Sequence, residues 1–364
     1  MNFKRICIIG MGLIGGSLAL AFKRKGIGLE IVGIDQQNIV EKAVAQGILN
    51  EGYQPSSLEN GLIGADLIIL ATPINQILEY LVPLAKMAPK GALVTDVGST
   101  KEQIVQIAQR EFQQGAFFLG GHPMAGSEKC GIDAADPFLF ENCFYILTPM
   151  EGIPANLVNQ LVGVLEQIGA KVLFLDAAVH DRIAAAVSHL PQMLAVCLVN
   201  FIEKCEHLQP NHLKLAAGGF RDMTRIASSP FYLWRDIFQT NSENIIQIVD
   251  DFIQELNCFK KNFSPAGLQE QFDQAAQTRL SIPKDTKGFI RPHFDVSVIV
   301  EDKPGVIAQI ATTLAAKHIN IRDIEVLKVR LWEGGTLRLS FESENDRAQA
   351  LDLLKEKGFM CQKR

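Results

Sequence analysis

The sequence predicts an α/β protein that begins with a doubly wound sheet, continues with an all-α domain and ends with a small βαββαβ domain. Three observations predict this order. A GxGxxG motif at residues 10–15 lies between an apolar strand and a helix. Apolar strands then alternate with helix-length segments up to residue 176, where helical spacing replaces them, and strand patterns return near residue 293. The expected domain bounds are 1–176, 177–280 and 293–364, with a linker at 281–292.

Composition argues against several classes of protein. The chain has 364 residues, of which 48% are hydrophobic, enough for two or three buried cores. Its formal net charge of −5 gives no basic surface, so neither nucleic acid nor a membrane is expected as a partner. The seven cysteines have no CxxC or metal-ligand spacing. We therefore expect reduced thiols, a cytoplasmic location and no metal site.

The N-terminus superficially resembles a secretion signal. Lys4 and Arg5 precede an apolar run at residues 6–22, which is the order of charge and hydrophobicity in a signal peptide. That run contains a patterned array of glycines, and Lys23 follows where a small residue would mark a cleavage site. The run is therefore expected to belong to the fold.

The first elements have the order of a Rossmann-type nucleotide-binding unit. A strand is expected at residues 5–10, a helix at 17–25 after the glycine motif, and a second strand at 30–34. A bare GxGxxG motif is weak support for a dinucleotide site, but its place between strand and helix strengthens the interpretation.

Each glycine of the motif has an expected role. Gly10 makes the turn, Gly12 admits the pyrophosphate and Gly15 permits close packing of helix on strand, while the helix N-terminus offers free N–H groups to the phosphates. Asp35 ends the second strand, where a carboxylate accepts hydrogen bonds from the adenosine ribose and repels a 2′-phosphate, so NAD is favoured over NADP. The candidate NAD-binding residues are Gly10, Gly12, Leu13, Ile14, Gly15, Asp35, Thr72 and Pro73.

Further buried strands extend the sheet. They are expected at residues 65–71, 92–96, 117–119, 143–147 and 171–175, with helix-length segments between them. Such alternation predicts parallel strands, whose carboxyl ends share one edge and form the ligand site.

Two side chains after these strands are candidates for catalysis. His122 lies in the loop GGHPMAGSE at residues 120–128, and Ser99 follows the strand at 92–96. An imidazole and a hydroxyl at the sheet edge suit a substrate alcohol that loses a proton together with hydride. His122 in a plain surface turn and Ser99 as a helix N-cap are the alternatives.

The segment after residue 176 is expected to be helical. Residues 181–203 are apolar nearly all round, which predicts burial on every side, and Pro191 is expected to kink this helix. His189 lies on it, where a lone histidine is more often a core residue than a functional one. Residues 245–263 carry an apolar stripe at helical spacing. Two long apolar helices in one small segment predict that a second subunit completes the core.

Between these helices, Gly218 and Gly219 precede Arg221 and Arg225. Two arginines four residues apart can form surface ion pairs. They can equally bring a guanidinium to a carboxylate substrate, for which the bidentate geometry is favourable.

Six motifs occur in order along the first 280 residues: GMGLIGG, DVGS, GGHPMAGSE, SHLPQ, GGFRDMTRIA and WRDIF. Together they resemble the prephenate dehydrogenase family of tyrosine biosynthesis. The resemblance implies that His122 is the catalytic base and that Ser99 hydrogen-bonds the same hydroxyl. It also implies a substrate site lined by His189, Arg225, Ser127 and Glu128, with Gly218 and Asp222 contributed by the partner of a homodimer or larger oligomer.

Strands are expected at residues 293–300, 320–330, 336–342 and 359–362, and helices at 304–317 and 346–357. With the stretches EDKPGVI at 301–307 and HINI at 318–321, this C-terminal part resembles the ACT domain, which usually binds amino acids between paired copies. The candidate effector-binding residues are Asp302, Pro304, Gly305, Val306, Ile307 and Asn320. L-Tyrosine is the expected effector, as the end product of the implied pathway, and a dimerising appendage without a ligand is the alternative.

The resemblance implies NAD-dependent oxidative decarboxylation of prephenate to 4-hydroxyphenylpyruvate. Arogenate dehydrogenase is the alternative within the same class. A non-catalytic amino-acid sensor on a dehydrogenase scaffold is an alternative of another class. A 3-hydroxyacid dehydrogenase would share the layout, but those enzymes use a lysine base on the helical domain, whereas the candidate base here is His122 on the first domain.

Overall fold

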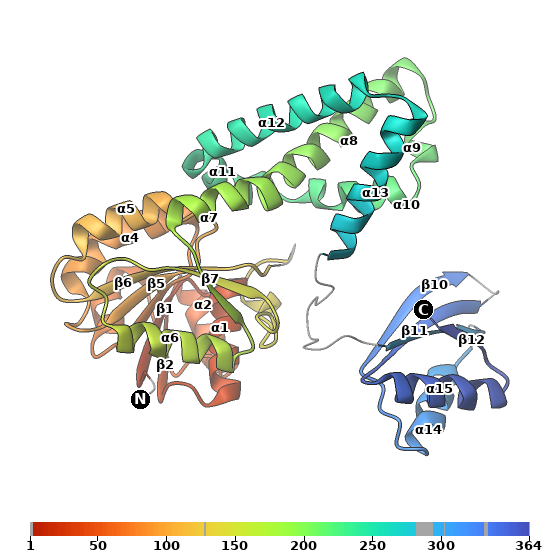
Figure 1. Ribbon diagram of the computed structural model, residues 1–364. Helices are drawn as coiled ribbons and strands as arrows, with labels where there is room; N and C mark the ends of the chain where they lie inside the picture. The colour runs from red at the N-terminus through yellow and green to blue at the C-terminus, as the bar shows by residue number, and fades with distance from the viewer. Residues whose placement is uncertain (1–2, 127–128, 282–293, 302, 331–333, 364) are drawn as a thin grey trace. The chain divides into compact units, whose positions relative to one another are not determined.

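The computed structural model describes residues 3–126, 129–281, 294–301, 303–330 and 334–363. The chain divides into two compact units, Met1–Ser281 and Ile282–Arg364 (Figure 1). This division agrees with an independent C-terminal domain. The finer bounds given above stay predictions, and the expected linker lies outside the described residues except for Ser281.

The first unit contains an eight-stranded sheet in the order β3-β2-β1-β4-β5-β6-β7-β8. Its strands are β1 (Arg5–Ile9), β2 (Glu30–Ile34), β3 (Glu51–Tyr53), β4 (Leu67–Leu70), β5 (Leu93–Asp96), β6 (Phe117–Pro123), β7 (Phe144–Thr148) and β8 (Lys171–Phe174). The helices between them are α1 (Leu13–Lys25), α2 (Gln37–Ala45), α3 (Leu58–Leu62), α4 (Ile74–Met87), α5 (Glu102–Glu111) and α6 (Ala155–Gln167), with short turns η1 (Pro55–Ser57) and η2 (Ile132–Ala134). The doubly wound class is thus confirmed.

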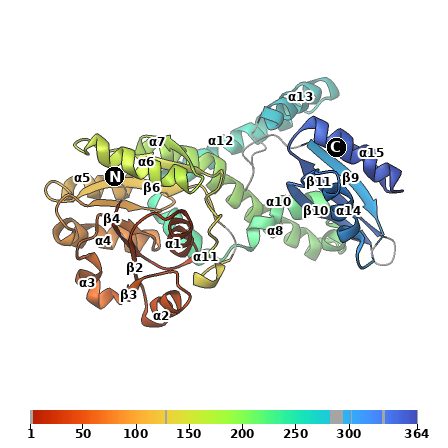
Figure 2. The same cartoon turned by 90° about the horizontal axis from the view of Figure 1, so that it is seen from below.

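Helices cover both faces of this sheet (Figures 1 and 2). Alternate residues of β1 enter different cores: Ile6 and Ile8 pack with α1 and α6, while Cys7 and Ile9 pack with α4 and α5. Burial on both faces explains why the strands are continuous apolar runs rather than alternating ones.

The expectation of uniformly parallel strands is wrong at one pair. The first part of β6 runs parallel to β5, with Leu119 opposite Thr95, but Gly120–Pro123 then pairs antiparallel with β7. Strand β6 is therefore longer than the expected 117–119 and changes partner at Gly120. A side chain on Gly120 would meet Thr148 Oγ1 at 2.3 Å, so glycine is needed at this change of partner.

The helical segment completes the first unit. It consists of α7 (Ala177–Ala184), the π-helical turn η3 (Ala185–His189), α8 (Leu190–Leu208), α9 (His212–Leu215), α10 (Gly218–Thr224), the 3₁₀ turn η4 (Arg225–Ser228), α11 (Phe231–Thr240), α12 (Ser242–Lys261) and α13 (Pro265–Ser281). In Figure 1, α8 and α12 run side by side away from the sheet.

The helix is distorted before Pro191, as expected, and the distortion takes the form of a widened turn. The Leu190 N–H donates to the Ala185 carbonyl, five residues back, so α7, η3 and α8 form one continuous helix with a π-helical turn. Proline donates no N–H and crowds the preceding turn, which favours such widening. The turn places His189 in the interior, where its side chain is buried.

The expectation that residues 181–203 are buried on every side is wrong within one chain. Val187 is 61% exposed and Phe201 is 60% exposed, and only Gln192 and Ala195 of α8 are buried. The run Ala177–Leu208 is long and apolar enough to cross a membrane by length and composition, and 22% of its most apolar window is buried. An apolar face left open in one chain is also what a subunit interface produces.

The second unit has the expected βαββαβ order. It comprises β9 (Phe294–Val300), α14 (Val306–Ala315), β10 (Asp323–Arg330), β11 (Gly334–Phe341), α15 (Glu344–Glu356) and β12 (Met360–Lys363). The strands form an antiparallel sheet in the order β10-β11-β9-β12. Its core joins Val298 and Leu339 of the sheet to Ile310 of α14 and Leu354 of α15.

Candidate active site

The glycine-rich turn has the geometry that a dinucleotide site requires. Gly10 has φ +98°, and a Cβ on it would meet the Ala71 carbonyl oxygen at 2.6 Å. A Cβ on Gly15 would meet the Gly10 carbonyl oxygen at 1.9 Å, so only glycine permits this approach of α1 to the turn. A Cβ on Gly12 would meet none of the described residues within 4 Å, and Gly12 gives the start of α1 no side-chain cap. The first N–H groups of α1 therefore have no side-chain cap among the described residues, as at a helix start that binds phosphate.

The acidic residue at the end of β2 is fixed beside this turn. Asp35 Oδ2 accepts a hydrogen bond from the Met11 N–H (2.7 Å), and Oδ1 accepts one from the Gln36 N–H (2.7 Å). The carboxylate is half-buried and retains acceptor capacity for a ribose hydroxyl. Thr72 Oγ1, at the end of β4, is buried and has no hydrogen-bond partner among the described residues. A polar cofactor group would satisfy it, so these residues fit NAD.

His122 lies in strand β6 rather than in the loop that the sequence predicts. Its Nδ1 is 2.8 Å from Nε2 of His180, and the two rings meet edge to face with centroids 5.0 Å apart. Burial lowers the pKa of His122 well below its ordinary value, and the neighbouring His180, Lys101 and His189 lower it further. The imidazole is therefore unprotonated at neutral pH and can accept a proton.

Two residues that the sequence interpretation missed, His180 and Asp181 in α7, complete this group. Nδ1 of His180 is 2.7 Å from Asp181 Oδ1, and both side chains are buried. Asp181 also accepts hydrogen bonds from the N–H groups of Lys101 (2.7 Å) and Glu102 (2.9 Å), so it caps α5 from another helix. The available signal was the adjacent His-Asp pair at the start of an apolar helix, because buried ionisable groups require partners.

A buried carboxylate, that of Asp96, links the two segments that carry the candidate catalytic residues. Asp96 at the end of β5 pairs with Lys101, and both side chains are fully buried. Burial lowers the pKa of Lys101, while the attraction of Asp96 opposes the shift. Asp96 also accepts from the N–H groups of Gly98 (2.8 Å) and Gly121 (3.0 Å). Ser99 and His122 are the residues that follow these glycines, so one carboxylate positions both.

The helix-cap alternative for Ser99 is wrong. Helix α5 begins at Glu102, three residues later, and its first N–H groups bond to Asp181. Ser99 is half-buried in the segment between β5 and α5. Its side chain is therefore not required for the start of the helix.

His189 is a neutral hydrogen-bonding group rather than a second base. Burial lowers its pKa to about 4, against the opposing effect of Asp181. Asn241 Nδ2 donates to the Asp181 carbonyl (2.9 Å) and lies 3.3 Å from His189 Nδ1. Asn244 Nδ2 donates to Asn241 Oδ1 (2.7 Å), which fixes the orientation of that amide. Nδ1 of His189 thus accepts, and its proton lies on Nε2.

The other predicted substrate residues lie on the helical segment or outside the described residues. Arg225 is exposed at the start of η4, which Gln192 anchors by donating to the Ile226 carbonyl (3.1 Å). Gly218 and Asp222 are exposed on α10, as residues that serve a partner subunit would be. Ser127 and Glu128 lie outside the described residues.

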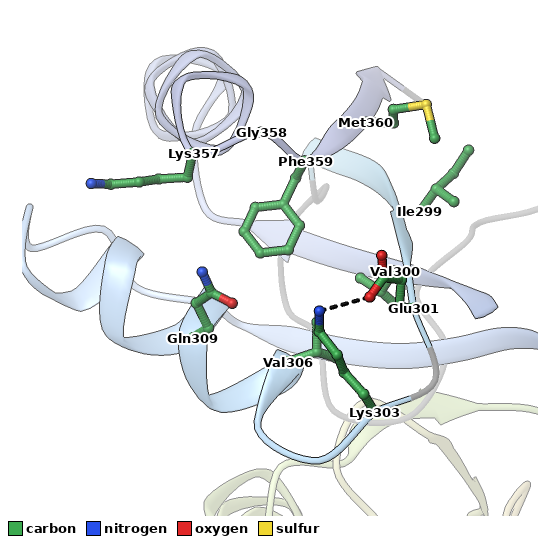
Figure 3. Close-up of a pocket in the computed structure, with 10 residues that line it drawn as sticks. All are labelled: Ile299, Val300, Glu301, Lys303, Val306, Gln309, Lys357, Gly358, Phe359 and Met360. Carbon is green, nitrogen blue, oxygen red and sulfur yellow. Dashed lines mark hydrogen bonds and ion pairs between the residues drawn. The ribbon is translucent and has the colours of Figure 1, made fainter.

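Two pockets lie near the start of α14 in the second unit. One, of about 360 Å³, is lined by Lys303, Gln309, Lys357 and Phe359 among others (Figure 3). The other, of about 350 Å³, is lined by four of the candidate effector residues, Pro304, Gly305, Val306 and Ile307. Asn320 is exposed and is not among the described residues that line either pocket, and Asp302 lies outside the described residues.

A dinucleotide-binding turn and a candidate histidine base on one sheet are the features of an NAD-dependent dehydrogenase, the class to which the protein belongs. Residues 18–174 match the family model of the prephenate dehydrogenase nucleotide-binding domain, and residues 176–277 match that of the prephenate dehydrogenase dimerization domain. Residues 294–358 match the ACT domain. The chain belongs to the prephenate dehydrogenase family, with an ACT domain at its C-terminus. The dimerization domain accounts for the open apolar face of α8 and supports a homodimer.

Similarity to individual proteins, in sequence and in structure, supports this assignment. A prephenate dehydrogenase of Bacillus subtilis is 40% identical over 95% of this chain and 94% of its own length. A crystal structure of prephenate dehydrogenase from A. aeolicus, in complex with hydroxyphenyl propionate and NAD+, superposes with TM-score 0.72 at 31% identity over 78% of this chain and 99% of that one. The Synechocystis arogenate dehydrogenase structure gives TM-score 0.66 at 33% identity over 77% of this chain and all of that one.

Proposed function

We propose that the protein converts prephenate to 4-hydroxyphenylpyruvate and carbon dioxide in tyrosine biosynthesis, with NAD as the oxidant. The observation that carries the proposal is the neutral His122 imidazole, held at the end of the parallel part of the sheet by the carboxylate that also positions Ser99. Ring carbon C4 of prephenate bears a hydroxyl and a hydrogen, and C1 bears a carboxylate. Oxidation of such a substrate requires a base that accepts the hydroxyl proton. It requires no acid beside the ring carboxylate, which leaves as carbon dioxide.

In this mechanism His122 accepts the proton of the C4 hydroxyl, and Ser99 hydrogen-bonds the same oxygen. NAD, held by the glycine turn and Asp35, supplies the hydride acceptor when it is bound. Loss of carbon dioxide from C1 then makes the ring aromatic, so the overall step is effectively irreversible.

The side-chain carboxylate of prephenate needs a cation, and we assign that role to Arg225. A guanidinium clamped on the ring carboxylate would instead oppose its departure. His189, as a neutral Nε2–H donor, suits a hydrogen bond to substrate. Ser127, Glu128 and the partner's Gly218 and Asp222 complete the proposed site.

Arogenate, which has an amino group where prephenate has a keto group, is the second candidate substrate. The similarity to the Synechocystis arogenate dehydrogenase favours it. The test is a spectrophotometric assay of the purified protein with prephenate and arogenate, each with NAD and NADP. We expect the highest kcat/KM with prephenate and NAD. Preference for arogenate would reassign the substrate, and no reduction of either coenzyme would favour a non-catalytic sensor.

We further propose that L-tyrosine binds the ACT domain and inhibits the enzyme. The pocket lined by Pro304 to Ile307 supports this, because Gly305, with φ +91°, opens α14 and leaves its first N–H groups without a side-chain cap. A ligand carboxylate is the natural acceptor for such groups.

All seven cysteines are free thiols, which supports a cytoplasmic location.

A further inference from the structure

The structure assigns His180 and Asp181 to the catalytic apparatus: we propose that they fix which nitrogen of His122 accepts the substrate proton and stabilise the cation that forms. The contacts are a chain from His122 Nδ1 to His180 Nε2 (2.8 Å) and from His180 Nδ1 to Asp181 Oδ1 (2.7 Å). His180 is 2% exposed and Asp181 fully buried, so water does not compete for these bonds. This assignment rests on the proposed role of His122 as base.

The direction of each hydrogen bond follows from Asp181. Its carboxylate accepts from the backbone N–H groups of Lys101 and Glu102, which can only donate. Because Asp181 acts as an acceptor, a His180 ring that carries one hydrogen holds it on Nδ1. His180 Nε2 then carries a lone pair, so the hydrogen between the two rings belongs to His122 Nδ1. The free lone pair of His122 is therefore on Nε2.

The same chain acts after proton transfer. When His122 Nε2 takes the hydroxyl proton, the ring becomes an imidazolium with N–H groups at both nitrogens. Its Nδ1–H already donates to His180, whose own N–H donates to the buried anion Asp181. The positive charge thus forms beside a prepared acceptor and needs no rearrangement, which is the advantage of a preorganised site. His180 and Asp181 do not touch the proposed substrate, so they are positioning residues.

Fixed imidazole tautomers have a signature that does not depend on activity. In protein labelled with ¹⁵N-histidine, nitrogen shifts and long-range couplings report which ring nitrogen bears hydrogen. We expect Nδ1–H tautomers for both His122 and His180. In the variant H180L, His122 should lose its preference for Nδ1–H and move toward Nε2–H, which histidine favours in water. An Nε2–H tautomer of His122 in the wild type would overturn the inference, even in an active enzyme.

Kinetics of three variants separate positioning from folding. H180L removes the acceptor, and we expect kcat to fall about 100-fold, within the usual range for impaired general-base catalysis, with KM nearly unchanged. H180Q places an amide oxygen near Nε2, can still accept from His122, and should retain kcat within about tenfold. The control D176A removes the cap of the same helix α7, whose Asp176 accepts from Ala178 (2.9 Å) and Val179 (3.1 Å). It should lower the melting temperature and leave the tautomers and kcat unchanged.

The outcomes distinguish this inference from the proposed reaction. Equal losses in H180L and H180Q, or unchanged kcat in H180L, would remove His180 from the apparatus. A wild type that is inactive on prephenate and arogenate but shows the Nδ1–H tautomers would refute the proposed function alone. If H180L fails to fold, the wild-type tautomers and H180Q still decide the matter.

Discussion

His122 is the residue on which the proposed chemistry depends, so its replacement is the first test at the residue scale. His122→Asn keeps similar size and some hydrogen bonding but removes the base. We expect kcat to fall roughly 10²–10⁴-fold, which is the usual contribution of general-base catalysis to the rate. Circular dichroism and the melting temperature should show an intact fold. A variant with near-wild-type kcat would exclude His122 from the mechanism.

The lowered pKa of His122 predicts the pH dependence of the wild type. A base acts only when unprotonated, and a lower pKa keeps it unprotonated at lower pH. The acid limb of kcat/KM, which reports the free enzyme, should therefore lie below the ordinary histidine value. Loss of activity with an apparent pKa at or above 6.5 would contradict the burial of this imidazole.

Asp35 determines the expected coenzyme preference. Its carboxylate is held by Met11 and Gln36 at the end of β2, where a ribose 2′-phosphate would meet a fixed negative charge. Asp35→Ser removes that repulsion, so the ratio of kcat/KM for NAD to that for NADP should fall. The ratio is measured with both coenzymes at saturating substrate. A wild type that used both equally well would refute this role for Asp35.

Arg225→Ala tests the substrate clamp. The proposed ion pair to the side-chain carboxylate exists in both ground and transition states, so its loss should raise KM for prephenate more than it lowers kcat. KM for NAD provides the internal control and should not change. An effect confined to kcat would contradict a simple binding role.

At the scale of elements, Asp236 joins α11 to the first turn of α4. It is buried and accepts from the backbone N–H (3.2 Å) and Nδ2 (2.9 Å) of Asn75. Asp236→Ala leaves these donors without their partner, so we expect a loss of about 1–3 kcal/mol in the free energy of unfolding by urea. Gln239→Ala removes an exposed hydrogen bond to the same Asn75 and is the matched control, with a much smaller loss expected. Equal effects would show that Asp236 contributes no buried link.

At the scale of the whole molecule, inhibition by tyrosine should require the ACT domain. A shortened chain that ends at Leu280 should remain active. The match to the A. aeolicus prephenate dehydrogenase covers 99% of that chain but only 78% of this one, so that protein lacks a counterpart of the ACT domain. We expect the full chain to lose activity as tyrosine is added and the shortened chain to be insensitive. Equal sensitivity would place inhibition at the active site, where tyrosine resembles the product.

Local sequence patterns were sufficient to predict the order of domains, most strands, the glycine turn and the candidate base. Apolar runs predict buried strands, and helical spacing predicts the helices after residue 176. Glycines mark positions where a side chain, as on Gly15, would strike a neighbouring carbonyl. Family resemblance added the proposed roles of Ser99, His189 and Arg225, which local patterns alone left open.

The arrangement around the base could be found only in the folded chain. His180 lies 58 positions from His122, and Asp181 lies 80 positions from Lys101, whose N–H donates to it, so no local pattern connects them. The reversal of β6 onto β7 and the π-helical turn at His189 likewise depend on pairing and packing with distant segments. Periodicity shows which side chains face a core, whereas the direction of a buried hydrogen bond depends on the partner that the fold places opposite.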